Sequence, residues 1–384
     1  MAGGFDSDAL MVGIIGVGNI SDTYLRNLTS IYSGTIQVVG CSDLDPERSE
    51  RARRTWSLPK TFASTQELLA DPGVDAAVVL TTPHDHFDTC WEAINAGKHV
   101  YVEKPISLTV QQGRTLVAHA QSNGVHLTAA PDTCLGRSHQ RALQVLDEGL
   151  IGRAVAASAV MLCHGHESWH PNPSFFYKPG AGPLLDMGPY YITALVSLMG
   201  PVVSVQGAAQ TTFSEREIYS DPLKGAKIHV EVPTHVAALL QFESGAIATL
   251  VTSFDVWDSK TPHIEIHGSL GSMVLPNPNW FDGEVLLCPS EDRVWRSLSP
   301  AVIEPKDRRG LGIIDLAQAV RSGQEPRLSG SLGLHVLEIM EAIALSAESG
   351  ERIEVQEYSG KICLRETTSA RTGGFPPSNG QPDT

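Results

Sequence analysis

Short apolar runs alternate with amphipathic stretches over the first third of the chain. Five β-branched runs predict strands, and four stretches between them have the apolar spacing of helices. The strands are expected at residues 11–15, 36–41, 76–80, 99–102 and 125–128, and the helices at 21–32, 46–56, 87–95 and 109–122. This order predicts a doubly wound α/β domain with a parallel sheet, closing near residue 130.

The pattern changes after residue 130, where one expected helix is followed by longer and more closely spaced strands. The helix is expected at 138–147 and the strands at 155–163, 202–210, 236–242, 246–253 and 263–267. The segment Glu243-Ser244-Gly245 offers a glycine for the positive φ of a hairpin turn. Apolar spacing predicts two covering helices at 311–321 and 333–347. We therefore expect an α+β domain with a large, open, mostly antiparallel sheet.

The length of the chain predicts two domains, and its composition indicates which kinds of partner it can bind. The 384 residues, 42% apolar and 18% charged, suit two folded domains at 10–130 and 131–366, with mobile ends at 1–9 and 367–384. A formal charge of -15 disfavours nucleic acid and anionic membrane surfaces as partners. The first basic residue is Arg26, no apolar run approaches a membrane span, and the six cysteines form no C-x-x-C pair. These features predict a cytoplasmic protein.

A glycine turn follows the first predicted strand and opens the first predicted helix. It comprises Gly16, Gly18, Asn19, Ile20 and Ser21, in which Gly16 permits the tight turn and Gly18 lets a pyrophosphate approach the backbone. These residues are expected to bind a dinucleotide.

Asp43 ends the second predicted strand, where a carboxylate can accept hydrogen bonds from the adenosine ribose. A carboxylate at that place repels a 2'-phosphate, so we expect NAD rather than NADP. The alternative is an ordinary turn acid before Pro46, with Asp45 as the cap of the following helix.

Two further segments end strands at the ligand-binding edge of the predicted sheet. Thr82, Pro83 and His86 follow the third strand, and Glu103-Lys104-Pro105 follows the fourth. With the glycine turn they resemble the Gfo/Idh/MocA family of NAD(P)-dependent sugar and cyclitol oxidoreductases, whose marks are G-x-G-x-x-[GAS], T-P-x-x-x-H and E-K-P.

The resemblance implies that these strand-end residues contact the cofactor and that Lys104 is catalytic. Its place at the sheet mouth, together with the bound cofactor, is expected to lower its pKa and make it a proton donor or a polariser. A solvated surface lysine is the alternative.

The segment from Gly180 to Tyr191 is similar to the family motif G-G-x-x-x-D-x-G-x-H. It departs from that motif at Ala181 and at Tyr190, which replaces the usual catalytic histidine. Pro189 fits a first helical turn, so the helix is expected to begin just after Asp186, which would cap it. The resemblance implies catalytic roles for Asp186 and Tyr190 and leaves open whether Tyr190, Asp186 or Lys104 moves the proton. A buried tyrosine that only packs is the alternative for Tyr190.

His166-Glu167-Ser168-Trp169-His170 spells the zincin motif H-E-x-x-H, which needs a helix to bring both imidazoles onto one face. A β-rich run precedes it and Pro171 follows, so we expect no helix and no metal site here. Aromatic faces with polar tips suit a sugar ring instead. The predicted substrate contacts are Lys104, His164, Trp169, His170, Tyr177, Asp186 and Tyr190. A packed loop with satisfied histidines is the alternative.

These observations predict an NAD-dependent oxidoreductase that exchanges hydride with a secondary ring hydroxyl of a sugar, glycoside or cyclitol. The protein is expected to form a homo-oligomer in which copies of the chain contact one another through the C-terminal sheet. Two other classes stay open. One is an NAD-binding sugar sensor without turnover, and the other is a zinc hydrolase that uses His166 and His170.

Overall fold

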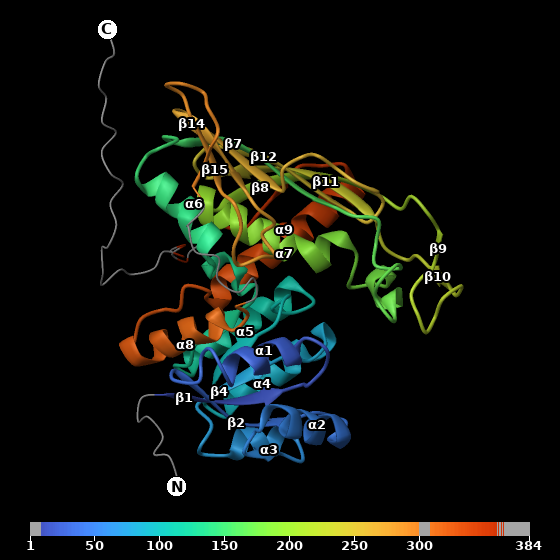
Figure 1. Cartoon of the computed structure of the whole chain (residues 1–384), viewed down its shortest axis with the longest axis vertical. Helices are drawn as coiled ribbons and strands as arrows, with labels where there is room; N and C mark the ends of the chain where they lie inside the picture. Colours follow the sequence, from blue (N-terminus) through green and yellow to red (C-terminus); the bar gives the residue numbers. More distant parts are fainter. Residues whose placement is uncertain (1–8, 299–307, 359, 361, 363, 365–384) are drawn as a thin grey trace.

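The computed structural model describes residues 9–298, 308–358, 360, 362 and 364. Nearly all of the two segments predicted to be mobile, 1–9 and 367–384, therefore lies outside the described residues, and so does Cys363. Two layered domains lie one above the other in Figure 1, with a parallel sheet at one end, a large sheet at the other, and helices between them.

The N-terminal sheet has the predicted parallel strands. Within the described chain it contains six strands in the order β3-β2-β1-β4-β5-β6, and every neighbouring pair is parallel. The strands are β1 (Leu10–Ile15), β2 (Ile36–Ser42), β3 (Lys60–Thr61), β4 (Ala76–Val79), β5 (His99–Val102) and β6 (Leu127–Ala129). The strand order reverses between β1 and β4, which is the position where open α/β sheets bind ligands. The sequence analysis missed only the short β3.

The described part of the first 130 residues contributes five α-helices to the cover of this sheet: α1 (Ser21–Leu28), α2 (Pro46–Trp56), α3 (Thr65–Ala70), α4 (His86–Asn95) and α5 (Val110–Ser122). The start of α2 is as predicted, because Asp45 accepts a hydrogen bond from the Glu47 amide and Pro46 takes the first helical position. Helix α1 ends four residues before the predicted end, and α3 was not predicted.

The second domain is built on a sheet of nine described strands in the order β16-β15-β14-β13-β7-β12-β11-β8-β17. The strands are β7 (Ala154–Leu162), β8 (Val202–Gln210), β11 (His235–Phe242), β12 (Ile247–Ser253), β13 (Ile264–Gly268), β14 (Gly271–Leu275), β15 (Leu286–Pro289), β16 (Arg296–Ser297) and β17 (Ile353–Glu354). The sheet is antiparallel except for the β7–β12 pair. The predicted β11–β12 hairpin is confirmed, with Gly245 at φ 82°. Strands β9 (Glu215–Glu217) and β10 (Lys227–His229) form a separate pair at one side of the molecule in Figure 1.

One face of the large sheet is covered by α6 (Arg137–Asp147), α7 (Pro183–Met199) and α9 (Gly330–Ser349), which lie between the two sheets (Figure 1). Helix α9 has the length and hydropathy of a membrane span, contrary to the expectation that no apolar run approaches one. More than half of that helix is buried inside the protein, and it packs on β8, α5 and α7. It is therefore built like the core helix of a folded domain.

Helix α8 (Leu311–Ser322) packs against the first domain, although the domain boundary predicted near residue 130 assigns it to the second. Its buried residues Ile313, Leu316 and Ala317 join the core formed by β1, β2 and β4. The C-terminal part of the chain thus returns to cover the first sheet, and this return carries the residues just before α8 into the site between the domains.

Candidate active site

The glycine turn has the geometry that dinucleotide binding requires. Gly16 has φ +87°, and a Cβ there would lie 2.9 Å from the Thr81 amide nitrogen. A Cβ at Gly18 would meet no atom within 4 Å, so the space above the start of α1 is open. The backbone can therefore approach a phosphate at Gly18, as the sequence predicts.

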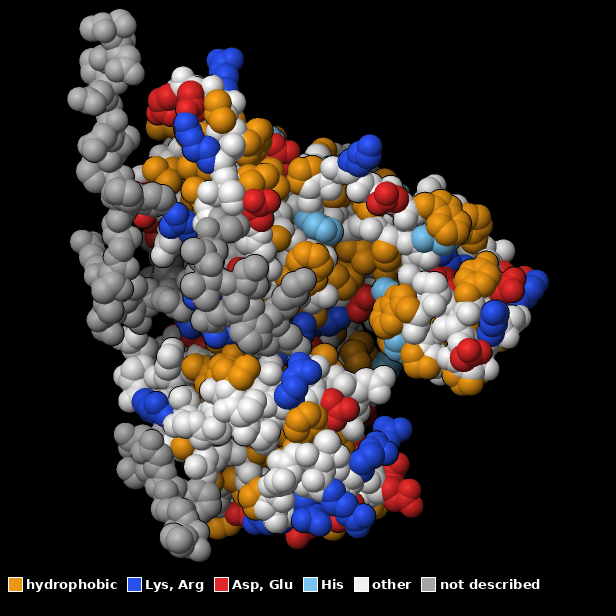
Figure 2. Space-filling view, viewed as in Figure 1, with side chains coloured by type: hydrophobic (Ala, Val, Ile, Leu, Met, Phe, Trp, Pro, Cys, Tyr) orange, Lys and Arg blue, Asp and Glu red, His pale blue; other side chains and the backbone are white. Residues whose placement is uncertain are grey.

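A cleft of about 780 Å³ opens at this turn. The first domain contributes the glycine turn, Thr82 and the basic side chains of α1 and α2, and the loop before α7 faces them from the second domain. The lining includes Val17, Gly18, Asn19, Arg26, Arg48, Arg51, Thr82, His170, Asn172 and Phe175. Figure 2 shows the surface hollowed between the two domains. The open glycine turn and the basic wall fit the pyrophosphate of NAD.

Asp43 lies beside this turn and is tied to it. One carboxylate oxygen accepts a hydrogen bond from the Val17 amide at 2.8 Å, and the other accepts one from the Asp45 amide at 2.9 Å. The carboxylate is thereby fixed at the end of β2, where the ribose is expected. Its contact with the ribose stays a prediction. Ile20 and Pro83 lie at the starts of α1 and of the short helix η1 (Pro83–Asp85).

Replacing Asp43 is expected to change cofactor preference. We predict that the wild type binds NADH more tightly than NADPH, and that Asp43→Ala weakens NADH binding and narrows the difference. Fluorescence titration with both cofactors measures this. Asp88→Ala is the control, because Asp88 is an exposed acid of α4 that is absent from the lining of the cleft. Equal affinity of the wild type for the two cofactors contradicts the assignment.

Lys104 and Asp186 form the polar centre between the domains. The Lys104 ammonium donates hydrogen bonds to Oδ1 of Asp186 at 2.9 Å and to its backbone oxygen at 2.6 Å. Both side chains are 18% exposed. Two residues that lie 82 positions apart in the sequence are thus brought together, as predicted.

The protein groups around Lys104 raise its pKa, so any lowering of that pKa would have to come from the bound cofactor. Burial lowers the pKa of Lys104, but the Asp186 carboxylate and its hydrogen bond, helped by Tyr190 and Glu103, outweigh burial and raise it above the ordinary value. Burial likewise raises the pKa of Asp186, but the Lys104 charge and the His166 ring hold it well below its usual range. The two groups form an ion pair in which Lys104 stays protonated.

Helix α7 begins at Pro183 and not after Asp186, which corrects the predicted capping role. Pro183 takes the first position after Gly182, and the Asp186 amide donates to the Gly182 oxygen within the first turn. Pro189 lies inside the helix. The Asp186 carboxylate caps no helix and is left to face Lys104.

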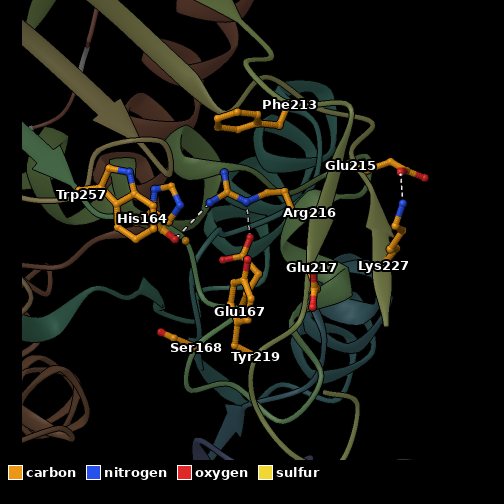
Figure 3. Close-up of a pocket in the computed structure, with 11 residues that line it drawn as sticks. His164, Glu167, Ser168, Phe213, Glu215, Arg216, Glu217, Tyr219, Lys227 and Trp257 are labelled. Atoms are coloured by element: carbon orange, nitrogen blue, oxygen red, sulfur yellow. Dashed lines mark hydrogen bonds and ion pairs between the residues drawn. The ribbon is translucent and has the colours of Figure 1, made fainter. Parts of the chain in front are cut away.

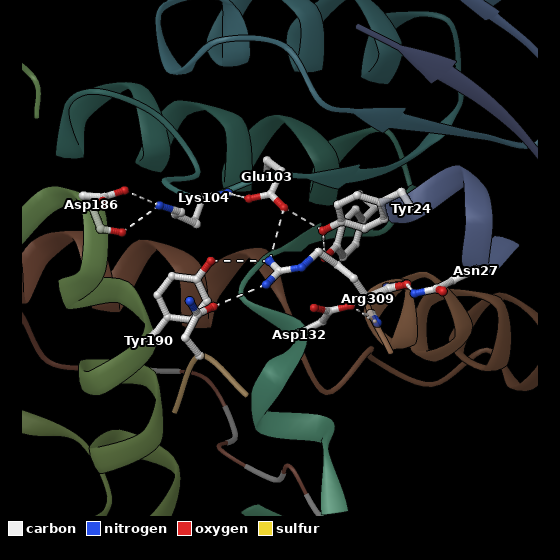
Figure 4. Close-up of polar contacts among 12 residues, drawn as sticks. Tyr24, Asn27, Glu103, Lys104, Asp132, Asp186, Tyr190 and Arg309 are labelled. Carbon is white, nitrogen blue, oxygen red and sulfur yellow. Dashed lines mark hydrogen bonds and ion pairs between the residues drawn. The ribbon is translucent and has the colours of Figure 1, made fainter. Parts of the chain in front are cut away.

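Tyr190 lies one turn further along α7, and its hydroxyl accepts a hydrogen bond from Arg309. The Arg309 guanidinium lies 3.3 Å from the Tyr190 hydroxyl and 3.9 Å from Oε1 of Glu103 (Figure 4). It also lies 3.3 Å from Oδ1 of Asn279. The Lys104 ammonium lies 5.4 Å from the centre of the Tyr190 ring. The ring therefore borders the Lys104–Asp186 pair, and its hydroxyl is directed to Arg309. The sequence analysis missed Arg309, which lies in no motif.

Glu103 is corrected from a predicted cofactor contact to a buried anchor. It is 7% exposed, and it accepts hydrogen bonds from the Tyr24 hydroxyl at 2.7 Å and from the Lys104 amide at 3.0 Å. These bonds hold the backbone that carries Lys104 against α1.

His86 is corrected in the same way. Its ring is fully buried, with Nδ1 2.7 Å from the Pro105 oxygen and Nε2 3.2 Å from the Thr81 oxygen. Burial lowers its pKa. The ring joins the two strand-end segments and is shielded from a ligand in the cleft.

Asp132 belongs to the same buried network at the start of α8. It lies in the short helix η2 (Asp132–Leu135), and its carboxylate accepts hydrogen bonds from the Gly310 and Gly312 amides at 2.7 and 3.3 Å. Burial raises the pKa of Asp132 to about 6, against the lowering effect of Arg309 and the two amides. The pKa of Asp132 in the folded protein exceeds its value of about 3.9 in the unfolded chain, so the folded protein holds the proton more tightly. The contribution of this proton to the free energy of unfolding is therefore full below about pH 4 and is lost as the pH rises to about 6.

Asp132→Asn is therefore expected to stabilise the protein at high pH only. The amide keeps an acceptor for Gly310 and removes the buried charge. The free energy of unfolding should exceed that of the wild type by on the order of 3 kcal/mol at pH 8 and match it near pH 4. Urea unfolding at both pH values measures the difference. A constant difference across this range contradicts the shifted pKa.

The H-E-x-x-H segment is not a helix, as predicted, and its glutamate is paired with Arg216 and Tyr177. Glu167 is 2% exposed and is ion-paired with Arg216 (Figure 3). It also accepts a hydrogen bond from the Tyr177 hydroxyl at 2.5 Å. Arg216 also bonds Asp255 at 2.8 Å and the His164 oxygen at 3.1 Å. The helical context that the zincin motif needs is missing, so the absence of zinc stays our prediction.

The predicted substrate residues of this loop separate into different surroundings. Tyr177 is fully buried on Glu167, so its predicted substrate contact is wrong. His164 stacks on Trp257 with ring centres 3.4 Å apart and lines a second cavity of about 470 Å³ beside β9 (Figure 3). Trp169 is 62% exposed. His170 lines the cleft opposite Gly18, and burial lowers its pKa. Of these four residues, His170 lines the cleft at the glycine turn, and its contact with a substrate stays a prediction.

A parallel sheet with an open glycine turn, and a buried lysine at the end of one of its strands that pairs with an aspartate of the next domain, define an NAD-binding oxidoreductase. Comparison with known proteins supports this class. Residues 10–130 match the model of an oxidoreductase family with an NAD-binding Rossmann fold, and residues 139–274 match the GFO/IDH/MocA C-terminal domain. The chain belongs to the Gfo/Idh/MocA family, and the predicted cofactor NAD is confirmed.

Several relatives match along most of the chain. A 1,5-anhydro-D-fructose reductase of Ensifer adhaerens is 25% identical over 351 residues, covering 90% of this chain and 98% of the relative. A myo-inositol 2-dehydrogenase of Thermotoga maritima is 23% identical, covering 91% and 100%. The structure of levoglucosan dehydrogenase with NADH and levoglucosan superposes with a TM-score of 0.80 at 21% identity, covering 91% of this chain and 100% of that one. The structural likeness confirms the two-domain fold.

Proposed function

We propose that this protein oxidises a secondary ring hydroxyl of a sugar, glycoside or cyclitol with NAD, or catalyses the reverse reduction. The observation that carries the proposal is the buried ion pair between Lys104 of the Rossmann domain and Asp186 of α7. The named activities of the Ensifer and Thermotoga relatives support the substrate class. Bound NAD supplies the hydride acceptor.

The residues of the chain supply orientation and charge. The Lys104 ammonium can donate a hydrogen bond to the reacting hydroxyl oxygen and stabilise negative charge that develops there. Asp186 holds this ammonium in place at 2.9 Å, and Glu103 fixes the backbone beneath it. The Tyr190 ring forms one wall of this centre. Neutral polyols suit such a site because hydroxyl groups can both donate and accept hydrogen bonds.

Formation of NADH tests the proposal. Purified protein is mixed with NAD and, separately, with myo-inositol, levoglucosan and a set of common hexoses, and with NADH and 1,5-anhydro-D-fructose for the reverse direction. We expect turnover with at least one compound of this class. Tight NAD binding without turnover of any of them would favour the sensor hypothesis, in which the same fold binds sugar and cofactor without chemistry. Retention of the Lys104–Asp186 pair speaks against that alternative.

We also propose that the open face of the large sheet joins copies of this chain. The face opposite the helices carries Leu239 and Ile247, which are 48% and 52% exposed on the neighbouring strands β11 and β12. Exposed apolar residues on a broad sheet suit a symmetric contact. Light scattering of the purified protein tests this, with a monomer as the contradicting result.

A further inference from the structure

The cavity of about 470 Å³ beside β9, called the β9 cavity from here on, has the size of a small-molecule site. Its walls include the aromatic rings of Phe213, Tyr219 and Trp257 and several polar side chains (Figure 3). None of the described residues that line it belongs to the cleft at the glycine turn or to the Lys104–Asp186 pair. The β9 cavity is therefore separate from the candidate active site.

The three aromatic side chains of the β9 cavity are unusually accessible to solvent. Trp257 is 81% exposed, Tyr219 56% and Phe213 47%. The His164 ring stacks on one face of the Trp257 indole, with the ring planes 13° apart, so the accessible face of the indole is the opposite one. Exposed apolar surface that gathers in one place is typical of a binding site.

The walls of the β9 cavity are fixed by bonds within the protein. The Arg216 guanidinium is ion-paired with Glu167 and donates a hydrogen bond to the His164 oxygen at 3.1 Å. The amides of Tyr219 and Ser220 donate to the Glu167 oxygen at 2.9 and 3.0 Å. These bonds join β9 and the residues after it to the loop before α7. A preformed site of this kind loses little conformational freedom when a ligand binds.

The polar groups of the β9 cavity favour a neutral ligand with hydroxyl groups. Three carboxylates and two cations line it, so a phosphate or a carboxylate is disfavoured. Lys227 pairs with Glu215 at 2.9 Å, whereas Glu217 forms no ion pair in the described part of the chain. The Glu217 carboxylate can accept hydrogen bonds from a ligand, and the hydroxyls of Ser168 and Tyr219 can donate or accept them.

We propose that the β9 cavity binds a neutral sugar ring at a site of its own, outside the redox centre. A pyranose has a face of C–H groups, which packs on the accessible face of Trp257. Its hydroxyl groups donate hydrogen bonds to the Glu217 carboxylate and exchange them with Ser168 and Tyr219. The binding is noncovalent and needs neither cofactor nor turnover, so the inference goes beyond the proposed function and stands independently of it.

The indole N–H resonances of protein with isotope-labelled tryptophan test this proposal. The chain has six tryptophans, and the resonance of Trp257 is assigned by its loss in Trp257→Phe. The protein is titrated without cofactor with D-glucose and myo-inositol as free rings, and with methyl β-D-glucoside and maltose as glycosides. We expect at least one of these probes to shift the Trp257 resonance saturably. The resonance of Trp295, which is 45% exposed and lies outside the cavity lining, is the control and should not move.

Three results of this titration would overturn the proposal. The first is a Trp257 resonance that no sugar shifts. The second is a shift that tetramethylammonium produces and no sugar reproduces, which would show a site for organic cations. The third is a resonance that responds only to protein concentration, which would show a contact between copies of the chain.

Two substitutions distinguish the β9 cavity from the redox centre. Glu217→Ala should weaken the sugar affinity read at Trp257 by about 10-fold or more, because a charged hydrogen-bond acceptor is lost. Glu348→Ala removes an exposed acid of α9 and should leave this affinity unchanged. Lys104→Ala should also leave it unchanged. Loss of the Trp257 titration in Lys104→Ala, or full affinity in Glu217→Ala, contradicts the proposal. A protein that turns over no sugar but retains the titration would refute only the proposed function.

Discussion

Lys104→Ala is expected to lower kcat by about 100-fold or more while NADH still binds. The large loss is expected because Asp186 holds the Lys104 ammonium at 2.9 Å, between the two domains. Its loss removes the donor for the reacting hydroxyl oxygen and leaves Asp186 without its partner. Steady-state kinetics with the fastest panel compound and NADH titration measure the two effects separately.

Two controls make the Lys104 result interpretable. Lys104→Arg keeps a cation near Asp186 and should retain more activity than Lys104→Ala. Lys260→Ala removes an exposed lysine of the second domain and should change nothing. An unchanged kcat in Lys104→Ala would contradict the proposed role of Lys104 in the chemical step. A loss of cofactor affinity without a loss of kcat would show that Lys104 only binds the cofactor.

Arg216→Met is expected to be the most destabilising of the substitutions considered, by about 3–5 kcal/mol. The Arg216 side chain is 5% exposed and is paired with Glu167 and Asp255, whose side chains are 3% and 7% exposed. Removing it leaves two buried carboxylates without their cation. It also removes the hydrogen bond to the His164 oxygen, which holds the loop before α7.

The matched control lies in the same strand pair. Lys227 and Glu215 form an exposed ion pair at 2.9 Å, with side chains 69% and 55% exposed. Lys227→Met should change the free energy of unfolding by less than about 1 kcal/mol, because solvent screens such pairs. Urea unfolding of both variants gives the comparison. If both variants lose a similarly small amount of unfolding free energy, the ion pairs of Arg216 contribute little to stability.

Features determined by neighbouring residues were predictable from the sequence. Gly16 must accept positive φ, and Asp45 with Pro46 defines the start of α2. The order of strands follows from the apolar runs and the parallel topology. The family motifs also predicted that Lys104 and Asp186 act together, although 82 positions separate them.

Features that depend on distant partners were not predictable. Arg309 reaches Tyr190 across 119 positions, and no local pattern marks it. The raised pKa of Lys104 depends on the exact proximity of Asp186, which outweighs burial. Pro183 and Asp186 are both acceptable helix starts, and tertiary packing selects Pro183. His86 and Tyr177 have polar side chains that suit ligands, but their partners inside the protein bury them.

The central claim is direct hydride transfer between a ring carbinol and NAD, and isotopic labelling tests it. The panel compound that is oxidised fastest is prepared with deuterium on its ring carbinol carbons and incubated with the purified protein and NAD. We expect NADH that carries one deuterium from the substrate and is formed at a reduced rate. Unlabelled NADH, or no NADH from any compound of the panel while NAD binds, would contradict it.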